Sequence, residues 1–166
     1  MYTVKELIND LESFNLWVET LQKIEDHFFF EPIAAGKWSV AEIISHITFW
    51  DEYILEEMLP VMKPDADIHS IEFEPLNQKA AKYALSGVSP QSLINRQLEM
   101  RKKVVSALKE KTEEEFFSAF TLNGEKIDEY SGYPHSMFNY FASFVWHDNH
   151  HKKQIEEFLS EKHVKV

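Results

Sequence analysis

Apolar residues at the start of the chain recur every three or four positions, the spacing of one face of an α-helix packed in a bundle. This pattern predicts a helix from about residue 3 to about residue 28. The stripe consists of Val4, Leu7, Leu11, Phe14, Val18 and Leu21.

A second helical pattern follows the turn signals that end near Gly36. Ser39 and Glu42 have the spacing of a capping box, in which each side chain satisfies a backbone N–H of the first turn. We therefore expect a helix from Ser39 that ends before Pro60. Its apolar stripe consists of Ile43, Ile47, Trp50 and Ile54.

A proline-containing stretch at residues 60–87 predicts a long crossover with one short helix at about residues 76–85. Ser89 and Pro90 then have the residue types of an N-cap and a first helical position. They predict a third long helix, which carries Leu93, Leu98, Val104, Val105 and Leu108.

Two more helices are expected in the last third of the chain. Thr112 and Glu115 form another capping-box pattern, which predicts a short helix to about residue 120. Residues 121–134 are irregular, and we expect Pro134 to open a fourth long helix that extends to about Glu161.

Composition fits this all-α interpretation. A chain of 166 residues with 44% hydrophobic and 14% aromatic residues can form one domain with a sizeable core. Only four glycines are present, and alternating β-branched runs are missing. We therefore expect a single all-α domain over residues 1–166.

Charge and cysteine content exclude several partners and chemistries. The net charge of -11 disfavours nucleic acid and anionic membrane surfaces, because both require a concentrated basic face. The chain has no cysteine, so a protein thiol can be neither nucleophile nor ligand. No targeting segment or membrane span is recognisable, and we expect a cytoplasmic protein.

Polar residues interrupt the apolar stripe of the last helix. Asp148 and His151 fall on the same helical stepping as the aromatic and aliphatic residues around them. Burial of such groups without partners would cost a few kcal/mol each, so hydrogen bonds, water or a metal ion must satisfy them. The apolar members of the stripe are Phe141, Phe144, Ile155 and Phe158.

His147 and His151 are the strongest candidates for chemistry. Their four-residue separation places both imidazoles on one helix face, about 40° apart around the axis. Two neutral imidazoles so placed can bind one transition metal, but tight binding needs a third ligand. His46, on the inward side of the second helix, is the candidate for it.

A purely structural role for these histidines fits the sequence as well as metal binding does. A lone histidine beside an apolar face is more often a hydrogen-bonded core residue than a ligand, and this applies to His46. His150 also shares a face with His147, at a three-residue step, and competes with His151. We prefer His151 because His150 points away from the stripe, toward solvent.

Several features follow one another over nearly the whole chain: Trp38-Ser39 at the start of the second helix, then His46, His147, His151, Gln154 and Ile155. In these residues and their order, the chain resembles the DinB/YfiT-like superfamily of metal-binding four-helix bundles. The resemblance implies an up-up-down-down bundle with a long crossover, three histidines around a divalent metal, and often a homodimer. Carried over to this chain, the metal ligands are His46, His147 and His151.

Groups around the three histidines would complete such a site. Imidazole donors suit a divalent ion, zinc or nickel first and then iron. Metal-binding histidines usually donate their second N–H to a carboxylate or carbonyl, so Asp148, Glu42 and Asp51 are candidate partners. Gln154 lies on the same face as His151 and could hold a ligand or a substrate.

Aromatic residues near the histidines are candidate walls of an apolar cavity, although core packing is the simpler role for each of them. They are Trp50, Tyr53, Tyr140 and Phe144.

Three functions fit these residues. The first is a metal-dependent transferase that joins a low-molecular-weight thiol to a small electrophile, a reaction found in the resembled family. The second is metal-assisted hydrolysis, with Asp148 or Glu42 handling the proton. The third is a protein that binds a metal or a small molecule without catalysis, in a stress role.

Overall fold

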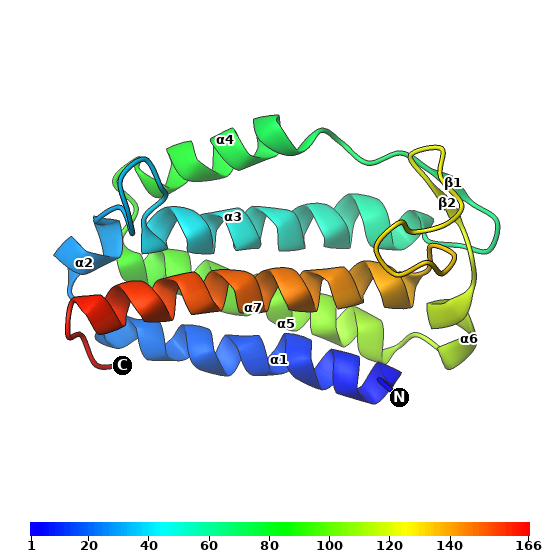
Figure 1. The fold of residues 1–166 in the computed structure, drawn as a ribbon, viewed down its shortest axis with the longest axis horizontal. Coiled ribbons are helices and arrows are strands. Elements are labelled where there is room, and N and C mark those ends of the chain that lie inside the picture. The colour runs from blue at the N-terminus through cyan, green and yellow to red at the C-terminus, as the bar shows by residue number, and fades with distance from the viewer.

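In the computed structural model, which describes residues 1–166, four long helices pack side by side as a bundle (Figure 1). None of the helices combines the length and the hydropathy that crossing a bilayer requires. The predicted all-α four-helix bundle is confirmed. The long helices are α1 (Val4–Thr20), α3 (Val40–Tyr53), α5 (Pro90–Lys109) and α7 (Met137–Glu161).

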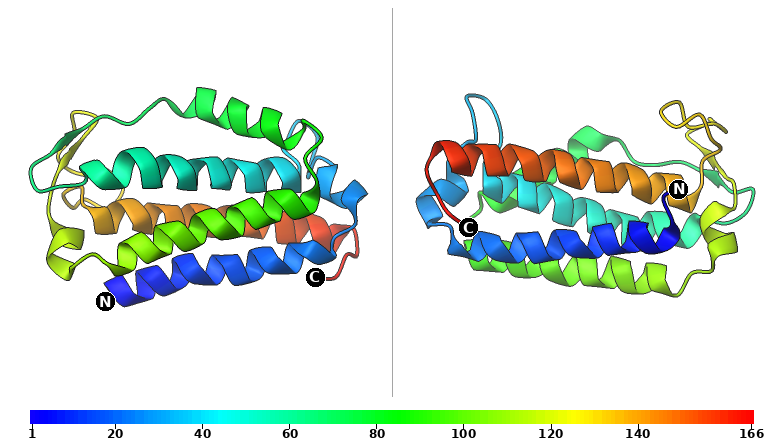
Figure 2. Two further views of the ribbon diagram at one scale, coloured as in Figure 1. Left: turned by 180° about the vertical axis from the view of Figure 1, so that it is seen from behind. Right: turned by 60° about the horizontal axis from the view of Figure 1, so that its bottom comes forward.

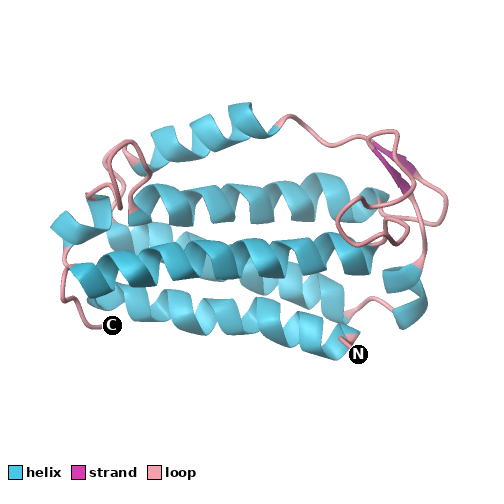
Figure 3. Cartoon of the chain, in the orientation of Figure 1, coloured by secondary structure: helices cyan, strands magenta, loops and turns pink.

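Most of the shorter elements close the ends of the bundle, whereas α4 (Phe73–Ala84) lies along its side against α3, and nearly all regular structure is helical (Figure 3). The two strands are only two residues long and pair in parallel, with Asp67 opposite Thr121. The short elements are η1 (Leu21–Lys23), α2 (Asp26–Phe30), η2 (Ile54–Met58), η3 (Leu59–Val61), β1 (Asp67–Ile68), α4 (Phe73–Ala84), α6 (Glu113–Phe117) and β2 (Thr121–Leu122).

Helix starts follow the capping signals of the sequence. Ser39 and Glu42 form a complete capping box at the start of α3, and Thr112 and Glu115 form another at α6. Ser89 caps α5 as predicted, with its hydroxyl accepting from the backbone N–H of the third helical residue. These caps fix where α3, α5 and α6 begin.

Two helix boundaries differ from the prediction. α1 ends at Thr20, because the buried Ile24 adopts an extended backbone that separates η1 from α2. α7 begins at Met137, because the hydroxyl of Ser136 accepts from a first-turn N–H and makes it the N-cap. Pro134 lies before that cap, in a bridge to the preceding loop.

The order of helix directions also differs from the predicted up-up-down-down. The side chain of Asn15 bonds the carbonyl of Leu98, and the carbonyl of Leu11 accepts from Arg101, so α1 and α5 are antiparallel. Figures 1 and 2 show that α7 runs with α1 and that α3 runs with α5. The order is therefore up-down-down-up.

Connection lengths explain this order. The turns and short helices between α1 and α3 stay at one end of the bundle, so α3 starts where α1 finishes (Figure 1). The predicted long crossover, which includes α4, returns the chain from the end of α3 to the start of α5. These two helices can therefore be parallel neighbours.

A polar layer divides the core into two apolar clusters. One cluster includes Ile47 of α3 and Ile155 of α7, and the other includes Ile54 of η2 and Phe141 of α7. Between them the side chains of α3, α5 and α7 are buried but polar. The buried polar residues of this layer are His46, Asp51, Gln97, Arg101, Asp148 and His151.

Candidate metal centre

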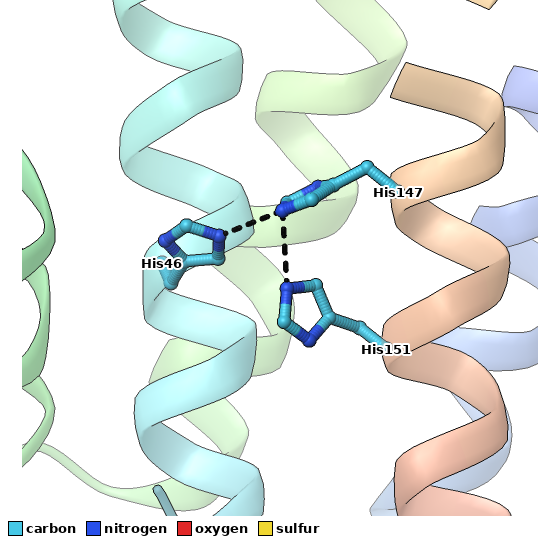
Figure 4. A group of neighbouring side chains, drawn as sticks. All are labelled: His46, His147 and His151. Carbon is cyan, nitrogen blue, oxygen red and sulfur yellow. Dashed lines mark hydrogen bonds between the residues drawn. The ribbon is translucent and has the colours of Figure 1, made fainter. Parts of the chain in front are cut away.

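Three imidazoles from two helices converge on one point, as Figure 4 shows. Nε2 of His147 is 3.1 Å from Nε2 of His46 and 3.1 Å from Nε2 of His151. One ring nitrogen from each histidine lies within 4.8 Å of the other two. We call these three residues the histidine cluster.

The second ring nitrogen of His46 is held by the crossover helix. Its Nδ1 lies 2.9 Å from Oδ1 of Asn77 in α4, and the same oxygen accepts from Nε1 of Trp50 at 2.9 Å. Because an indole N–H is only a donor, the shared atom must be the amide oxygen. Nδ1 of His46 therefore carries the proton, and its Nε2 presents a lone pair to the cluster.

His151 is held in the same manner by Gln154. Its Nδ1 lies 2.9 Å from Oε1 of Gln154, one turn further along α7. An Nδ1–H bond to that oxygen leaves Nε2 of His151 as a second lone pair. The predicted Gln154 thus lies against a candidate ligand and orients its ring.

Burial keeps the histidine cluster neutral. Burial, together with the neighbouring His151, lowers the pKa of His46 to about 4, and burial lowers the pKa of His147 to about 3. The pKa of His151 is also lowered, again chiefly by burial. Neutral imidazoles are the form that binds metal.

Proton counting shows that the histidine cluster suits a cation. Nε2 of His147 faces the lone pairs of His46 and His151, and a single N–H there can satisfy only one of them. Two nitrogens about 2.1 Å from one tetrahedral zinc ion would lie roughly 3.4 Å apart, close to the two 3.1 Å distances from Nε2 of His147. The donor set therefore fits a divalent transition metal, with at least one position left for another ligand.

The competing candidate on α7, His150, lies outside the histidine cluster. His150 is exposed, and its ring stacks on Trp146 at a centroid distance of 5.4 Å. The structure thus brings His151, rather than His150, to the point where His46 and His147 meet.

The predicted carboxylate partners bind other groups. Oε1 of Glu42 accepts from the backbone N–H and the hydroxyl of Ser39 in the capping box. Asp148 and Asp51 both turn to a guanidinium on α5. The expected carboxylate support is not found at His46 or His151, because the second ring nitrogen of each lies against an amide oxygen instead.

That guanidinium belongs to Arg101, which is 1% exposed. It donates to Asp51 at 2.8 and 3.1 Å and to Asp148 at 2.8 and 3.2 Å, and its Nη1 also donates to the carbonyl of Leu11 at 3.1 Å. Gln97 adds a bond to Asp51 at 3.0 Å. We call Asp51, Gln97, Arg101 and Asp148 the arginine cluster.

Burial and the neighbouring charges shift the pKa values of Arg101 and Asp148 in the arginine cluster. Although burial opposes its charge, Asp148 and Asp51 raise the pKa of Arg101 above its ordinary value. Burial raises the pKa of Asp148 to about 6, against the pull of Arg101. Sequence analysis missed Arg101, although it breaks the apolar stripe of α5 much as the histidines break that of α7.

A cavity of about 700 Å³ opens beside the histidine cluster. His46 and His147 form part of its wall, and no charged side chain lines it. Its other lining residues are Trp50, Phe73, Asn77, Tyr130, Ser143, Phe144 and Trp146.

Of the predicted aromatic walls, Trp50 and Phe144 line this cavity, while Tyr53 and Tyr140 do not. The hydroxyl of Tyr53 instead contacts Met58 and accepts from the backbone N–H of Ile71. Tyr140 packs on Phe144 behind the wall.

A bundle with three inward imidazoles beside an apolar cavity defines a class of metal-binding helical proteins. Comparison with family models makes the assignment specific: the chain belongs to the DinB superfamily, whose model matches residues 12–155. The family predicted from the sequence is confirmed.

A solved structure supports the same fold. It is described as YfiT from Bacillus subtilis, "a probable metal-dependent hydrolase with an unusual four-helix bundle topology". The TM-score is 0.74 at 15% sequence identity, and the match covers 98% of this chain and 89% of the other. The comparison with curated proteins gives no match.

Proposed function

We propose that this protein is a divalent-metal-dependent transferase that joins a low-molecular-weight thiol to a small electrophilic molecule. The observation that carries the proposal is a set of three neutral imidazoles beside a 700 Å³ cavity with no carboxylate in its lining. The nucleophile must therefore become an anion without a protein base.

A thiol meets that requirement. A divalent ion at the three nitrogens would lower the pKa of a coordinated thiol, so that the thiolate exists at neutral pH. The chain's own task is to hold His46, His147 and His151 neutral and oriented. Asn77 and Gln154 contribute to this through the second ring nitrogens of His46 and His151.

The cavity supplies the second half of the reaction. Its volume of about 700 Å³ falls in the range that encloses a small organic molecule. An electrophile in it would lie next to His46 and His147, with bulk water displaced by aromatic side chains. Sulfur forms a bond to the electrophilic carbon, the leaving group departs with its electron pair, and the thiol proton passes to solvent.

Hydrolysis is the second candidate, because the similar solved structure is described as a probable metal-dependent hydrolase. Water has a much higher pKa than a thiol, and a proton acceptor near the nucleophile usually assists hydrolysis. Asp148 and Glu42, the carboxylates that the sequence offered for this role, are engaged elsewhere. We therefore rank hydrolysis below thiol transfer.

The test is a turnover assay with tag-free protein loaded separately with zinc, nickel or iron(II). We expect 1-chloro-2,4-dinitrobenzene to be consumed faster than the uncatalysed rate only when thiol and metal are both present. His151→Ala should abolish this activity, and His150→Ala should retain it. Turnover of an ester without thiol would favour the hydrolase, and no turnover of either would leave a binding protein.

A further inference from the structure

The aromatic cavity has a chemical character that goes beyond the proposed reaction. Its aromatic wall is continuous: ring centroids are 5.9 Å apart for His147 and Phe144, 6.2 Å for Phe144 and Trp50, and 5.4 Å for Trp50 and Phe73. The wall thus leads from the histidine cluster at the floor to Phe73 at the rim.

The rim is apolar and open to solvent. Phe73, Tyr130 and Trp146 are 65%, 91% and 68% exposed, whereas Trp50 on the floor is 6% exposed. Exposed aromatic residues around a cavity mouth are typical of a binding site rather than of a stable surface. An incoming molecule would cover these rings and gain burial at the rim as well as at the floor.

Charge limits which molecule can enter. The cavity lining contains no lysine or arginine, and the chain as a whole carries a net charge of -11. A divalent ion at the histidine cluster would be the one cation that faces the cavity, and a coordinated thiolate would offset part of its charge. An anion farther out along the aromatic wall would therefore lose its hydration without gaining a cationic partner of its own. We propose that the cavity selects an uncharged, flat aromatic molecule as the electrophile; this deepens the proposed function and rests on it.

A matched pair of probes tests this selectivity on the metal-free protein, in which no zinc ion can bind the sulfonate. Naphthalene-2-sulfonate and methyl 2-naphthyl sulfone have nearly the same shape, but only the first is charged. We expect the neutral sulfone to quench tryptophan fluorescence with a Kd at least tenfold lower than that of the sulfonate. Equal or tighter binding of the sulfonate would overturn the proposal.

Two substitutions localise the binding. Phe73→Ala should weaken sulfone binding severalfold with little effect on folding, because the side chain is largely exposed. Phe117→Ala is the matched control: Phe117 is 51% exposed but lies outside the cavity, and sulfone binding should be unchanged. Equal losses in both variants would also overturn the proposal.

These measurements separate the two ideas. Sulfone binding without any thiol transfer would refute only the reaction. Thiol transfer with a preference for anionic electrophiles would refute only the selectivity.

The three imidazoles converge only if α3 and α7 are correctly rotated relative to each other. α3 carries His46 and α7 carries the other two histidines, yet α3 packs mainly on α4 and α5 and only lightly on α7. Direct packing between the two ligand-bearing helices therefore does little to set their rotation. Another part of the bundle must do so.

Arg101 is suited to that task. Its donors reach Asp51 of α3, Asp148 of α7 and the carbonyl of Leu11 in α1, from a position on α5. Asp148 directly follows His147, and each carboxylate accepts two bonds from the fork. A rotation of either helix that displaced the imidazoles would also break these bonds.

We infer that Arg101 is a positioning residue for the metal site. The test is to replace the ionic groups together, as Asp51→Leu, Arg101→Met and Asp148→Leu, because apolar replacement of a whole buried ion network is often neutral for folding. We expect the triple variant to fold, while its zinc affinity, measured by competition with a chromophoric chelator, falls at least tenfold. Arg96→Met is the control, since Arg96 also pairs with a carboxylate of α3.

A folded triple variant with unchanged zinc affinity would overturn this inference. Should the triple variant not fold, Arg101→Lys keeps the charge but loses the fork geometry. We expect it to weaken zinc binding and to alter the d–d spectrum of the cobalt-substituted protein. A cobalt spectrum and zinc affinity identical to those of the wild type would reject the role.

Discussion

Two polar clusters lie buried in the same layer of the bundle, and they differ in whether they are complete. The arginine cluster uses each of its five guanidinium N–H groups, in bonds to two carboxylates and one carbonyl. The histidine cluster has more lone pairs at its centre than protons to fill them. A complete cluster can hold helices together, whereas an incomplete one has nitrogen donors available for a ligand from outside.

The largest expected effect comes from making the complete cluster incomplete. Arg101→Ala leaves Asp148 buried without a partner and Asp51 with only the bond from Gln97, which should cost about 3–5 kcal/mol of unfolding free energy. Urea denaturation measures this loss. Arg96→Ala, at a half-exposed ion pair with Glu52, should cost about 1 kcal/mol or less. Equal losses would show that the arginine cluster has no special structural role.

Removing a histidine ligand should have the next largest effect. We expect His147→Ala and His151→Ala each to lower zinc affinity by at least about 100-fold, because loss of a ligand should exceed the effect of losing a ligand's partner. Chelator competition measures the affinity. His150→Ala should leave it unchanged, since His150 is exposed. A similar loss in all three variants would contradict the site as described.

Replacing the amides that hold the ligand histidines should lower zinc affinity less than replacing the histidines themselves. Asn77→Ala and Gln154→Ala remove the acceptors of His46 and His151, and each should reduce zinc affinity by about tenfold. Gln78→Ala is a neighbouring control, because Gln78 bonds only Glu74 on the surface of α4. An effect of Gln78→Ala as large as that of Asn77→Ala would point to α4 as a whole instead of to the amide.

The smallest effect is a dependence of metal-free stability on pH. The folded-state pKa of His46 is about 4, below its unfolded value of 6.5, so the unfolded state binds more protons between these values. Stability should therefore fall as pH drops from 7 to 6, by less than about 1 kcal/mol for each buried histidine.

Urea denaturation of the wild type and of His46→Gln at both pH values isolates the contribution of His46 to the pH dependence of stability. The raised pKa of Asp148 acts with the opposite sign, but it is common to both proteins and cancels in the difference. A variant with the same pH slope as the wild type would show that His46 does not contribute.

The sequence predicted features that depend on local spacing. Ser39 and Glu42 fixed the start of α3, and the four-residue step placed His147 and His151 on one face. The sequence also showed that Asp148 interrupts the apolar stripe of α7, but it did not identify Arg101 as the partner of Asp148. Arg101 reaches Asp148 only because α5 packs between α1 and α3, which no local pattern encodes.

Features set by tertiary packing could not be predicted in the same way. Asn77 lies in the crossover, where the sequence predicted a helix but no role in the site. The directions of the long helices depended on whether the chain between α1 and α3 stays at one end, and the turn signals there did not decide this.

The amide oxygen shared by Trp50 and His46 has a consequence for metal uptake. Since the indole settles which imidazole nitrogen keeps its hydrogen, His46 is ready for coordination before any ion arrives. Loading should then release no proton from this ring.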